Sequence, residues 1–194
     1  MSCSEFTART VHATEEQLAF GLNQITAAPK IDGTLELIVA RPQSGQRVVL
    51  ERGALTPEGG LSGDRWQADS WRKFPDGTPD PAVQITLMNA RCIALVAGDR
   101  EFWPLAGDNL FVDLDLSREN LPLGTRLLIA GAILEIAKPP HNGCWKFEGR
   151  FGKAALAFVN SPEGKKLRLR GVHARVVQGG SIAVGERIGV QRPA

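Results

Sequence analysis

The sequence predicts a mainly β domain of the α+β class, whose strands close into a barrel or a sandwich with a few short helices outside. Short β-rich segments recur at close spacing along the chain. Between them lie 21 Gly and 12 Pro residues, which punctuate the chain as they do in many closed β architectures. Strands and helices do not alternate regularly, which argues against a doubly wound parallel sheet.

The N-terminal part is expected to contain one short helix. Residues 1–13 are expected to be a mobile lead-in. Thr14 and Gln17 then have the spacing of a capping box, with Thr14 at the N-cap. Apolar residues follow at helical spacing, which predicts a helix over 14–25. From residue 34 onward the pattern changes to that of strands.

Strands are expected to make up most of the remaining chain. The β-rich runs predict strands at 34–40, 48–50, 83–88, 125–129, 133–137, 172–177 and 187–190. Ala130 and Gly131 separate two well-alternating runs and are expected to form the turn of a hairpin.

Two further helices and two irregular stretches complete the prediction. Asn89 is placed to cap a helix over about 90–97, and residues 151–160 have helical character. The stretches 56–65 and 71–81 are expected to be irregular. A loop as long as the first is usually either functional or disordered in a compact domain.

The composition is typical of a globular protein with its own core. Hydrophobic residues make up 43% of the chain, charged residues make up 23%, and the formal net charge is +2. This charge argues against a chain built to wrap nucleic acid. No stretch reaches the ~18 apolar residues of a membrane span, and the N-terminus lacks a secretory signal pattern. We therefore expect a cytoplasmic protein without a nucleic-acid or membrane partner.

The three cysteines are interpreted as free thiols, because an odd number at wide spacing argues against a disulfide framework. Cys92 lies on the apolar side of the predicted helix and is expected in the core. Cys3 lies in the lead-in and is expected to be an exposed, inert thiol.

Cys144 is the candidate reactive residue. It follows a predicted strand, and prolines and glycine just before it favour an irregular turn that lifts it out of the β core. His141, Lys146 and Arg150 lie close in sequence, and positive charge favours the thiolate. The alternative is a buried small hydrophobic residue. The residues alone leave these two interpretations evenly balanced.

Two polar segments are candidate ligand-binding sites. Gly63-Asp64-Arg65 ends a glycine-rich loop that offers backbone N–H groups and a guanidinium to an anion, although a flexible surface loop is the simpler interpretation. Gly107-Asp108-Asn109 is either a strand-entry turn or a polar corner that contacts a ligand. A solvated basic loop is expected at Lys165, Lys166, Arg168 and Arg170.

Six motifs, taken in order, point to a known family. They are the loop ending in Gly63-Asp64-Arg65, the segment 83–89, Gly107-Asp108-Asn109-Leu110, Leu121-Pro122-Leu123-Gly124-Thr125, Gly143-Cys144-Trp145-Lys146 and the segment 171–176. This series resembles the MOSC domain, named for the C-terminal domain of molybdenum cofactor sulfurases. The resemblance implies a MOSC-type closed β-barrel over residues 34–190, preceded by a lead-in and short helix in residues 1–33.

The resemblance also implies a role for Cys144. In such domains the cysteine either ligates molybdenum held by a pterin (molybdopterin) or carries sulfur as a persulfide. A thiolate is a soft ligand suited to this metal, and it is also the species that accepts sulfane sulfur.

The remaining site residues follow from the same resemblance. The pterin cofactor ends in a phosphate, for which Gly63, Asp64 and Arg65 offer donors, while Lys146 and Arg150 add positive charge. Asn109 has both donors and an acceptor and is expected to contact the edge of the pterin ring.

Two residues depart from the family pattern. Trp66 stands where the family commonly has His, and it is expected either to stack on a flat ligand or simply to pack. His173 replaces the more usual tyrosine of the closing motif.

Three functions therefore remain open. The first is binding of the molybdenum cofactor through Cys144, with reduction of N-hydroxylated substrates and a redox partner protein. The second is a sulfur carrier that takes sulfur on Cys144 from a separate pyridoxal-phosphate cysteine desulfurase. The third, kept open by Trp66, is a non-catalytic module that binds a small molecule or a partner.

Overall fold

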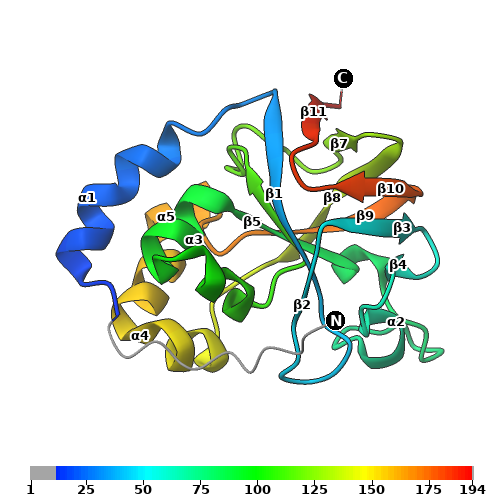
Figure 1. The fold of residues 1–194 in the computed structure, drawn as a ribbon, viewed down its shortest axis with the longest axis horizontal. Coiled ribbons are helices and arrows are strands. Elements are labelled where there is room, and N and C mark those ends of the chain that lie inside the picture. Colours follow the sequence, from blue (N-terminus) through cyan, green and yellow to red (C-terminus); the bar gives the residue numbers. More distant parts are fainter. Residues whose placement is uncertain (1–11, 194) are drawn as a thin grey trace.

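Seven strands close into a β-barrel in the computed structural model, which describes residues 12–193 (Figure 1). Around the barrel the order is β11 (Arg187–Gln191), β7 (Arg126–Ile129), β8 (Ala132–Pro140), β9 (Val172–Gln178), β5 (Ile85–Asn89), β6 (Leu110–Asp113) and β1 (Gly33–Ala40). The ring closes where β1 pairs with β11, with Gly33 opposite Ile188. The predicted fold class is confirmed, and the barrel replaces the sandwich alternative.

Strand pairing in the barrel is mostly antiparallel. Only β5 and β6 run parallel among the barrel neighbours of the described chain, with Leu87 opposite Leu110. The predicted hairpin is confirmed, because Ile129 pairs with Ala132 and leaves Ala130 and Gly131 as the turn. A short strand, β2 (Val48–Leu50), pairs with β1 beside the barrel.

A second, smaller sheet lies against the barrel. It consists of β10 (Gly180–Ala183), β3 (Arg52–Thr56) and β4 (Gly60–Leu61). The prediction that 56–65 is irregular throughout is wrong at β4, which pairs with the end of β3. With only two residues, β4 is too short to show an alternating pattern in the sequence.

Four α-helices gather on one side of the barrel (Figure 1). They are α1 (Glu15–Thr26), α3 (Ala90–Ala97), α4 (Trp145–Asn160) and α5 (Pro162–Leu167). The capping box at Thr14 and the Asn89 cap of α3 are both confirmed. Three further helical segments are α2 (Trp66–Asp69), η1 (Pro81–Val83) and η2 (Arg100–Ala106).

Helix α4 begins well before the predicted start at 151. Gly149 and Gly152 fall in its first half and lower the helical tendency of that stretch. At Gly152 the backbone leaves helical geometry, with φ 87° and ψ 168°, so α4 is kinked there. The first segment therefore starts immediately after Cys144.

Two apolar clusters form the core, one inside the barrel and one between the barrel wall and the helices. Strand β5 serves both, since Leu87 belongs to the inner cluster and Met88 to the outer one. Strand β1 does the same with Ile38 and Val39. Such strands are apolar on both faces and read as continuous hydrophobic runs.

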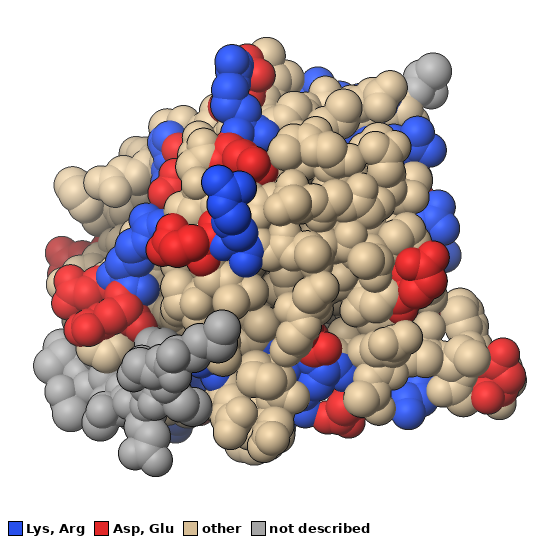
Figure 2. All heavy atoms as spheres, turned by 45° about the vertical axis from the view of Figure 1, so that its right-hand side comes forward, with Lys and Arg blue, Asp and Glu red and all other residues tan. Residues whose placement is uncertain are grey.

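Charged side chains are interspersed on the face shown in Figure 2, and a broad area without charge lies between them. The predicted lead-in over 1–13 lies outside the described residues except for its last two positions, and so does Cys3. Among the described residues, no helix combines the length and apolar character needed to cross a membrane.

Candidate functional site

Cys144 lies at the N-cap of α4, with its thiol exposed. Its carbonyl accepts hydrogen bonds from the N–H groups of Phe147 and Glu148, at 2.9 and 3.0 Å. Its side chain makes no capping hydrogen bond. The preceding turn is clamped from the far end of α4, because the Asn160 side chain bonds both the N–H and the carbonyl of Gly143. The thiol is thus not a core residue but is held on a fixed turn.

A cavity of about 800 Å³ opens beside Cys144, which is one of its lining residues. Its walls come from loops and strand ends far apart in the sequence. Six basic side chains line it: Arg41, Arg47, Arg65, Lys146, Arg150 and Arg170. Among the described residues no Asp or Glu belongs to this lining. The cavity therefore suits an anionic ligand.

Three of the six cations have no carboxylate partner within residues 12–193: Arg47, Lys146 and Arg150. Arg47 and Arg150 flank Gly107, where a Cβ atom would lie 3.2 Å from Arg47 Nη2 and 3.7 Å from Arg150 Nη1. Burial, together with the charge of Arg150, lowers the pKa of Arg47 to about 10. Unpaired cations at close range repel one another, and a bound anion would relieve this repulsion.

The thiol and one of these guanidinium groups are electrostatic neighbours. Burial lowers the pKa of Arg150, the charged form of Cys144 opposes that shift, and Arg170 adds to it. Arg150 Nη1 also donates to the Leu105 carbonyl at 2.6 Å, which fixes the guanidinium on the η2 side of the cavity.

Arg41 is held by a buried network behind the cavity wall. Its guanidinium donates to both carboxylate oxygens of Asp64, at 2.8 and 3.0 Å, and to Asn109 Oδ1 at 2.8 Å. Asn109 Nδ2 in turn donates to Asp64 Oδ2 at 2.9 Å. The Asp64 side chain is only 1% exposed. Asp64 and Asn109 thus orient Arg41, which lines the cavity itself.

The structure brings some of the expected site residues together and not others. Arg65, Lys146 and Arg150 line the same cavity as Cys144. Gly63, Asp64 and Asn109 are not among its lining residues. Asn109 is fully buried, and its Oδ1 also accepts from the Thr86 N–H. Because its amide is occupied inside the protein, the structure gives it no access to the edge of a ligand.

Trp66 packs rather than facing the cavity, since it is 6% exposed. This resolves the two alternatives for Trp66, while the substitution of the usual His, which kept a non-catalytic module open, remains. Two other tryptophans line the cavity, Trp71 at 71% exposure and Trp145 at 76%. Exposed indole rings at a cavity mouth suit a flat ligand, because aromatic rings stack on one another.

Arg170, His141 and Asp108 form a buried polar group at the inner end of the cavity. Arg170 Nη1 donates to Asp108 Oδ2 at 2.7 Å, and Asp108 is fully buried. Asp108 Oδ1 lies 3.4 Å from His141 Nδ1, and neither atom makes a hydrogen bond among the described residues. The expected solvated loop is wrong for Arg170, which is 7% exposed. Lys165 and Lys166 are also not on a loop, since they belong to α5.

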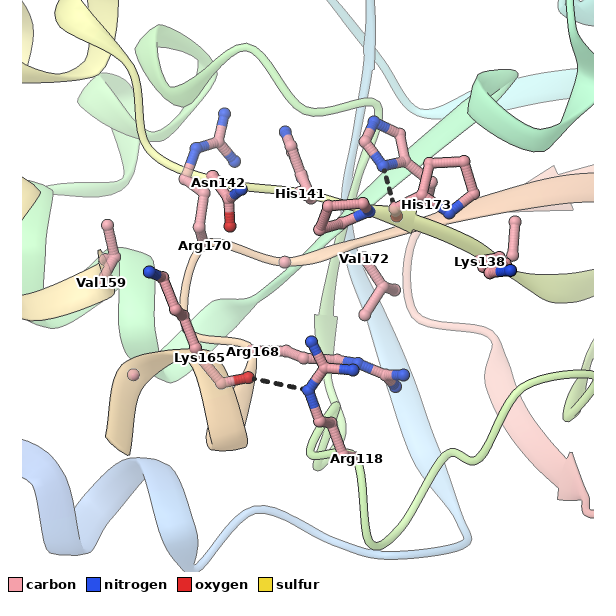
Figure 3. Close-up of a pocket in the computed structure, with 15 residues that line it drawn as sticks. Arg118, Lys138, His141, Asn142, Val159, Lys165, Arg168, Arg170, Val172 and His173 are labelled. Atoms are coloured by element: carbon pink, nitrogen blue, oxygen red, sulfur yellow. Dashed lines mark hydrogen bonds between the residues drawn. The ribbon is translucent and has the colours of Figure 1, made fainter. Parts of the chain in front are cut away.

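The rings of His141 and His173 lie side by side, with centroids 4.6 Å apart (Figure 3). The Trp71 ring follows, 6.1 Å from His173. Burial, with the nearby Arg170 charge, lowers the pKa of His141 well below its usual value. Burial also lowers the pKa of His173 from 6.5 to about 4, although a hydrogen-bond contact with the Pro139 carbonyl opposes this. Both imidazoles are therefore neutral at pH 7.

We expect His173 to make the protein less stable in mild acid. Between pH 6.5 and about 4, the unfolded chain binds a proton at this imidazole and the folded protein does not. The free energy of unfolding should fall by about 1.4 kcal/mol per pH unit for such a group. His173→Phe should remove one such contribution to the slope while keeping a ring in place. Urea denaturation from pH 7 to pH 4.5 measures this, and equal slopes in both proteins would contradict it.

The two described cysteines should react very differently. Cys92 is buried, its Sγ contacts the Leu169 carbonyl oxygen at 3.2 Å, and burial raises its pKa to about 12. Iodoacetamide should therefore modify Cys144 in the native protein and Cys92 only after unfolding, because the thiolate is the reactive form. Peptide mass spectrometry after timed labelling checks this. If Cys92 were labelled as fast as Cys144 in the native protein, the conclusion that the Cys92 thiol is buried would be contradicted.

Several cavity residues were not found from the sequence: Arg41, Arg47, Trp71 and Arg170 as lining residues. Arg41 directly follows β1, and a charged residue at a strand end is a signal that could have found it. Arg47 and Trp71 lie in irregular segments, where no pattern distinguishes a cavity residue from a surface residue.

Comparisons with known proteins address the fold and the family. Residues 103–189 match the MOSC domain family model. No curated protein matches the chain. The YuaD protein from Bacillus subtilis is similar in structure, with a TM-score of 0.62 and 17% identity over 84% of this chain and 98% of that one. YiiM from Escherichia coli has a TM-score of 0.52 and 16% identity, covering 83% and 71%. YiiM from Geobacillus stearothermophilus has a TM-score of 0.54 and 15% identity, covering 82% and 75%.

At these sequence identities, the similarity to solved structures supports the fold alone. The family match adds to them, because it covers the barrel from η2 to β11 and includes Cys144. The motif order noted in the sequence agrees with both. Residues 103–189 of this chain match the MOSC domain family, and the solved structures support the same fold over most of the chain.

Proposed function

We propose that the cavity beside Cys144 binds the molybdenum cofactor and that the Cys144 thiolate ligates the molybdenum. One observation carries the proposal: an exposed thiol lines a cavity with six basic side chains and, among the described residues, no lining carboxylate. A soft thiolate suits this metal, and guanidinium groups suit the phosphate at the end of the pterin.

The residues present fit the chemical parts of this cofactor. Arg47, Lys146 and Arg150 have no carboxylate partner in residues 12–193 and are available to a phosphate. Trp71 and Trp145 offer exposed rings to a flat pterin. The volume of about 800 Å³ falls within the range of ordinary small-molecule sites.

The chain's own residues would then prepare the site. The turn clamped by Asn160 holds Cys144 at the cavity wall, with the Arg150 guanidinium as a neighbouring positive charge. When bound, the cofactor supplies two-electron redox chemistry. Reduction of an N-hydroxylated substrate to the amine also takes up two protons and releases water. The neutral imidazoles of His141 and His173 line the cavity and can each make a hydrogen bond to the substrate. The electrons would come from a redox partner protein.

The test is to purify the protein from a host that makes the cofactor. Molybdenum is measured by mass spectrometry, and the pterin by fluorescence after oxidation. We expect comparable molar amounts of both, and electron transfer to an amidoxime probe when a reductant is supplied. Absence of both metal and pterin, together with no uptake on reconstitution, would overturn the proposal.

A second candidate is a sulfur carrier, and the exposure of Cys144 at the start of α4 favours it. A partner must reach the thiol to deliver sulfur, and an exposed thiol allows this. Incubation with a pyridoxal-phosphate cysteine desulfurase and cysteine should add one sulfur atom at Cys144, and Cys144→Ala should prevent it. Equal labelling of Cys3 and Cys92 would count against this role.

A further inference from the structure

A second, smaller cavity of about 260 Å³ adjoins the cavity beside Cys144, and Figure 3 shows the residues that line the smaller one. The two cavities share the lining residues Pro140, His141, Asn142, Arg170 and His173. Four further basic side chains line only the smaller one: Arg118, Lys138, Lys165 and Arg168. Within the described chain, no Asp or Glu lines this cavity either.

The four additional cations form no ion pair with any carboxylate of residues 12–193. Arg118 and Arg168 lie near each other in Figure 3. Burial, and then the charge of Arg118, lowers the pKa of Arg168 to about 10. The pair is thus held together at an electrostatic cost that no carboxylate of residues 12–193 offsets.

Backbone contacts fix both guanidinium groups in this arrangement. Arg118 Nε donates to the Lys165 carbonyl at 3.3 Å. Arg168 Nη1 donates to the Leu121 carbonyl at 2.6 Å, and Arg168 itself adopts a left-handed conformation with φ 52° at the end of α5. Arg168 Nη1 also donates to the Leu116 carbonyl at 3.4 Å. Nε and Nη2 of Arg168 and both Nη atoms of Arg118 make no hydrogen bond among the described residues, and so are available to a ligand.

Two buried atoms of residues that line both cavities also make no hydrogen bond within residues 12–193. They are Arg170 Nε and His141 Nδ1, the second of which lies 3.4 Å from Asp108 Oδ1. The Arg170 side chain is only 8% exposed. An unsatisfied buried donor next to a cavity is costly unless a ligand or water accepts its hydrogen bond.

We infer that the smaller cavity binds a phosphate group, either as inorganic phosphate or as the phosphate of a small phosphorylated metabolite. The dianion would lie among Arg118, Lys165 and Arg168, with Arg170 at the inner wall. Guanidinium and ammonium groups bind phosphate oxygens through charge-assisted hydrogen bonds. This site shares Arg170 with the cavity beside Cys144, but Arg118, Lys165 and Arg168 line only the smaller cavity, so the site does not depend on the proposed cofactor.

The experiment is calorimetric titration of the protein with inorganic phosphate and, in a second arm, with glycerol 3-phosphate, at constant ionic strength. The double variant Arg118→Gln/Lys165→Gln should weaken binding at least tenfold. Lys166→Gln is the matched control, because Lys166 lies on the same helix turn and does not line the cavity. It should change the affinity less than twofold. Tighter binding of inorganic phosphate or of glycerol 3-phosphate identifies the source of the ligand, and either supports the site.

Arg47→Gln separates the two cavities, because Arg47 lines only the larger one. If phosphate binding is lost in Arg47→Gln and unchanged in the Arg118→Gln/Lys165→Gln variant, the phosphate lies beside Cys144 and the inference is overturned. It is also overturned if neither compound binds at 20 mM, a ceiling set well above the ~1 mM of weak but specific sites. Both substituted side chains in the double variant are exposed, so it should fold, and a thermal unfolding curve verifies this.

Discussion

Cys144→Ser should abolish molybdenum binding and leave the fold intact. The serine hydroxyl is nearly isosteric with the thiol but remains protonated at pH 7, and it is a poor ligand for a soft metal. Cofactor affinity should fall more than ~100-fold, since changes beyond the directly bound ligands already cost 10–100-fold. Because the Cys144 side chain is exposed and makes no capping hydrogen bond, stability should change by less than about 0.5 kcal/mol.

The matched control is Cys92→Ala, for which the opposite pattern is expected. Cys92 is fully buried beneath the helices, so its truncation should lower stability by ~1–2 kcal/mol. Its folded fraction should keep the metal. Molybdenum per folded chain, measured by mass spectrometry beside a urea denaturation curve, distinguishes the two variants. Normal molybdenum content in Cys144→Ser would show that the cofactor is held without the thiolate.

Asp64→Ala should be the most destabilising of the changes considered. It leaves Arg41, whose side chain is 18% exposed, without its carboxylate, and it removes acceptors from Asn109 and from the Trp66 N–H. Breaking one side of a buried ion pair typically costs ~3–5 kcal/mol. Asp69→Ala is the control, because its pairing with Arg65 is exposed and should contribute less than about 1 kcal/mol. Urea denaturation at pH 7 measures both, and equal losses would contradict the buried network.

The same network should also lose part of its stabilising effect in acid. Burial raises the pKa of Asp64, but the hydrogen bonds and charge of Arg41 outweigh burial and hold it below its ordinary value of 3.8. The stabilisation is therefore complete above the unfolded pKa and is lost as the pH falls through the lower folded pKa. The difference in unfolding free energy between the native protein and Asp64→Ala should shrink below pH 4.

The parts of the fold that were predictable are those with a local signal. β7 alternates exposed and buried residues and is followed by a two-residue turn, so the β7–β8 hairpin could be located in advance. The capping patterns at Thr14 and Asn89 depend on neighbours in the sequence. β6 and β10 have four residues each, and their existence depends on partners far along the chain, such as β1 and β3.

The residues of the candidate site also fall into those that local sequence patterns could predict and those that they could not. Cys144, Lys146 and Arg150 lie within one turn and the helix after it, so their proximity could be inferred from the sequence. Arg41 reaches the same cavity only because β1 pairs with β6, which no local pattern reveals. A motif also does not state which way a side chain faces. Asn109 is close in sequence to Gly107, which lines the cavity, but the Asn109 amide faces the protein interior.

Because the two cavities share lining residues, the binding of a ligand in one should affect the binding of a ligand in the other. His141 and Arg170 line both cavities, so anions bound in the two cavities would compete for the one Arg170 guanidinium. Repulsion between them makes each bind more weakly when the other is present. Thermodynamic linkage requires the two effects to be equal. A protein built this way would release its larger ligand more readily as phosphate accumulates, without any movement of the barrel.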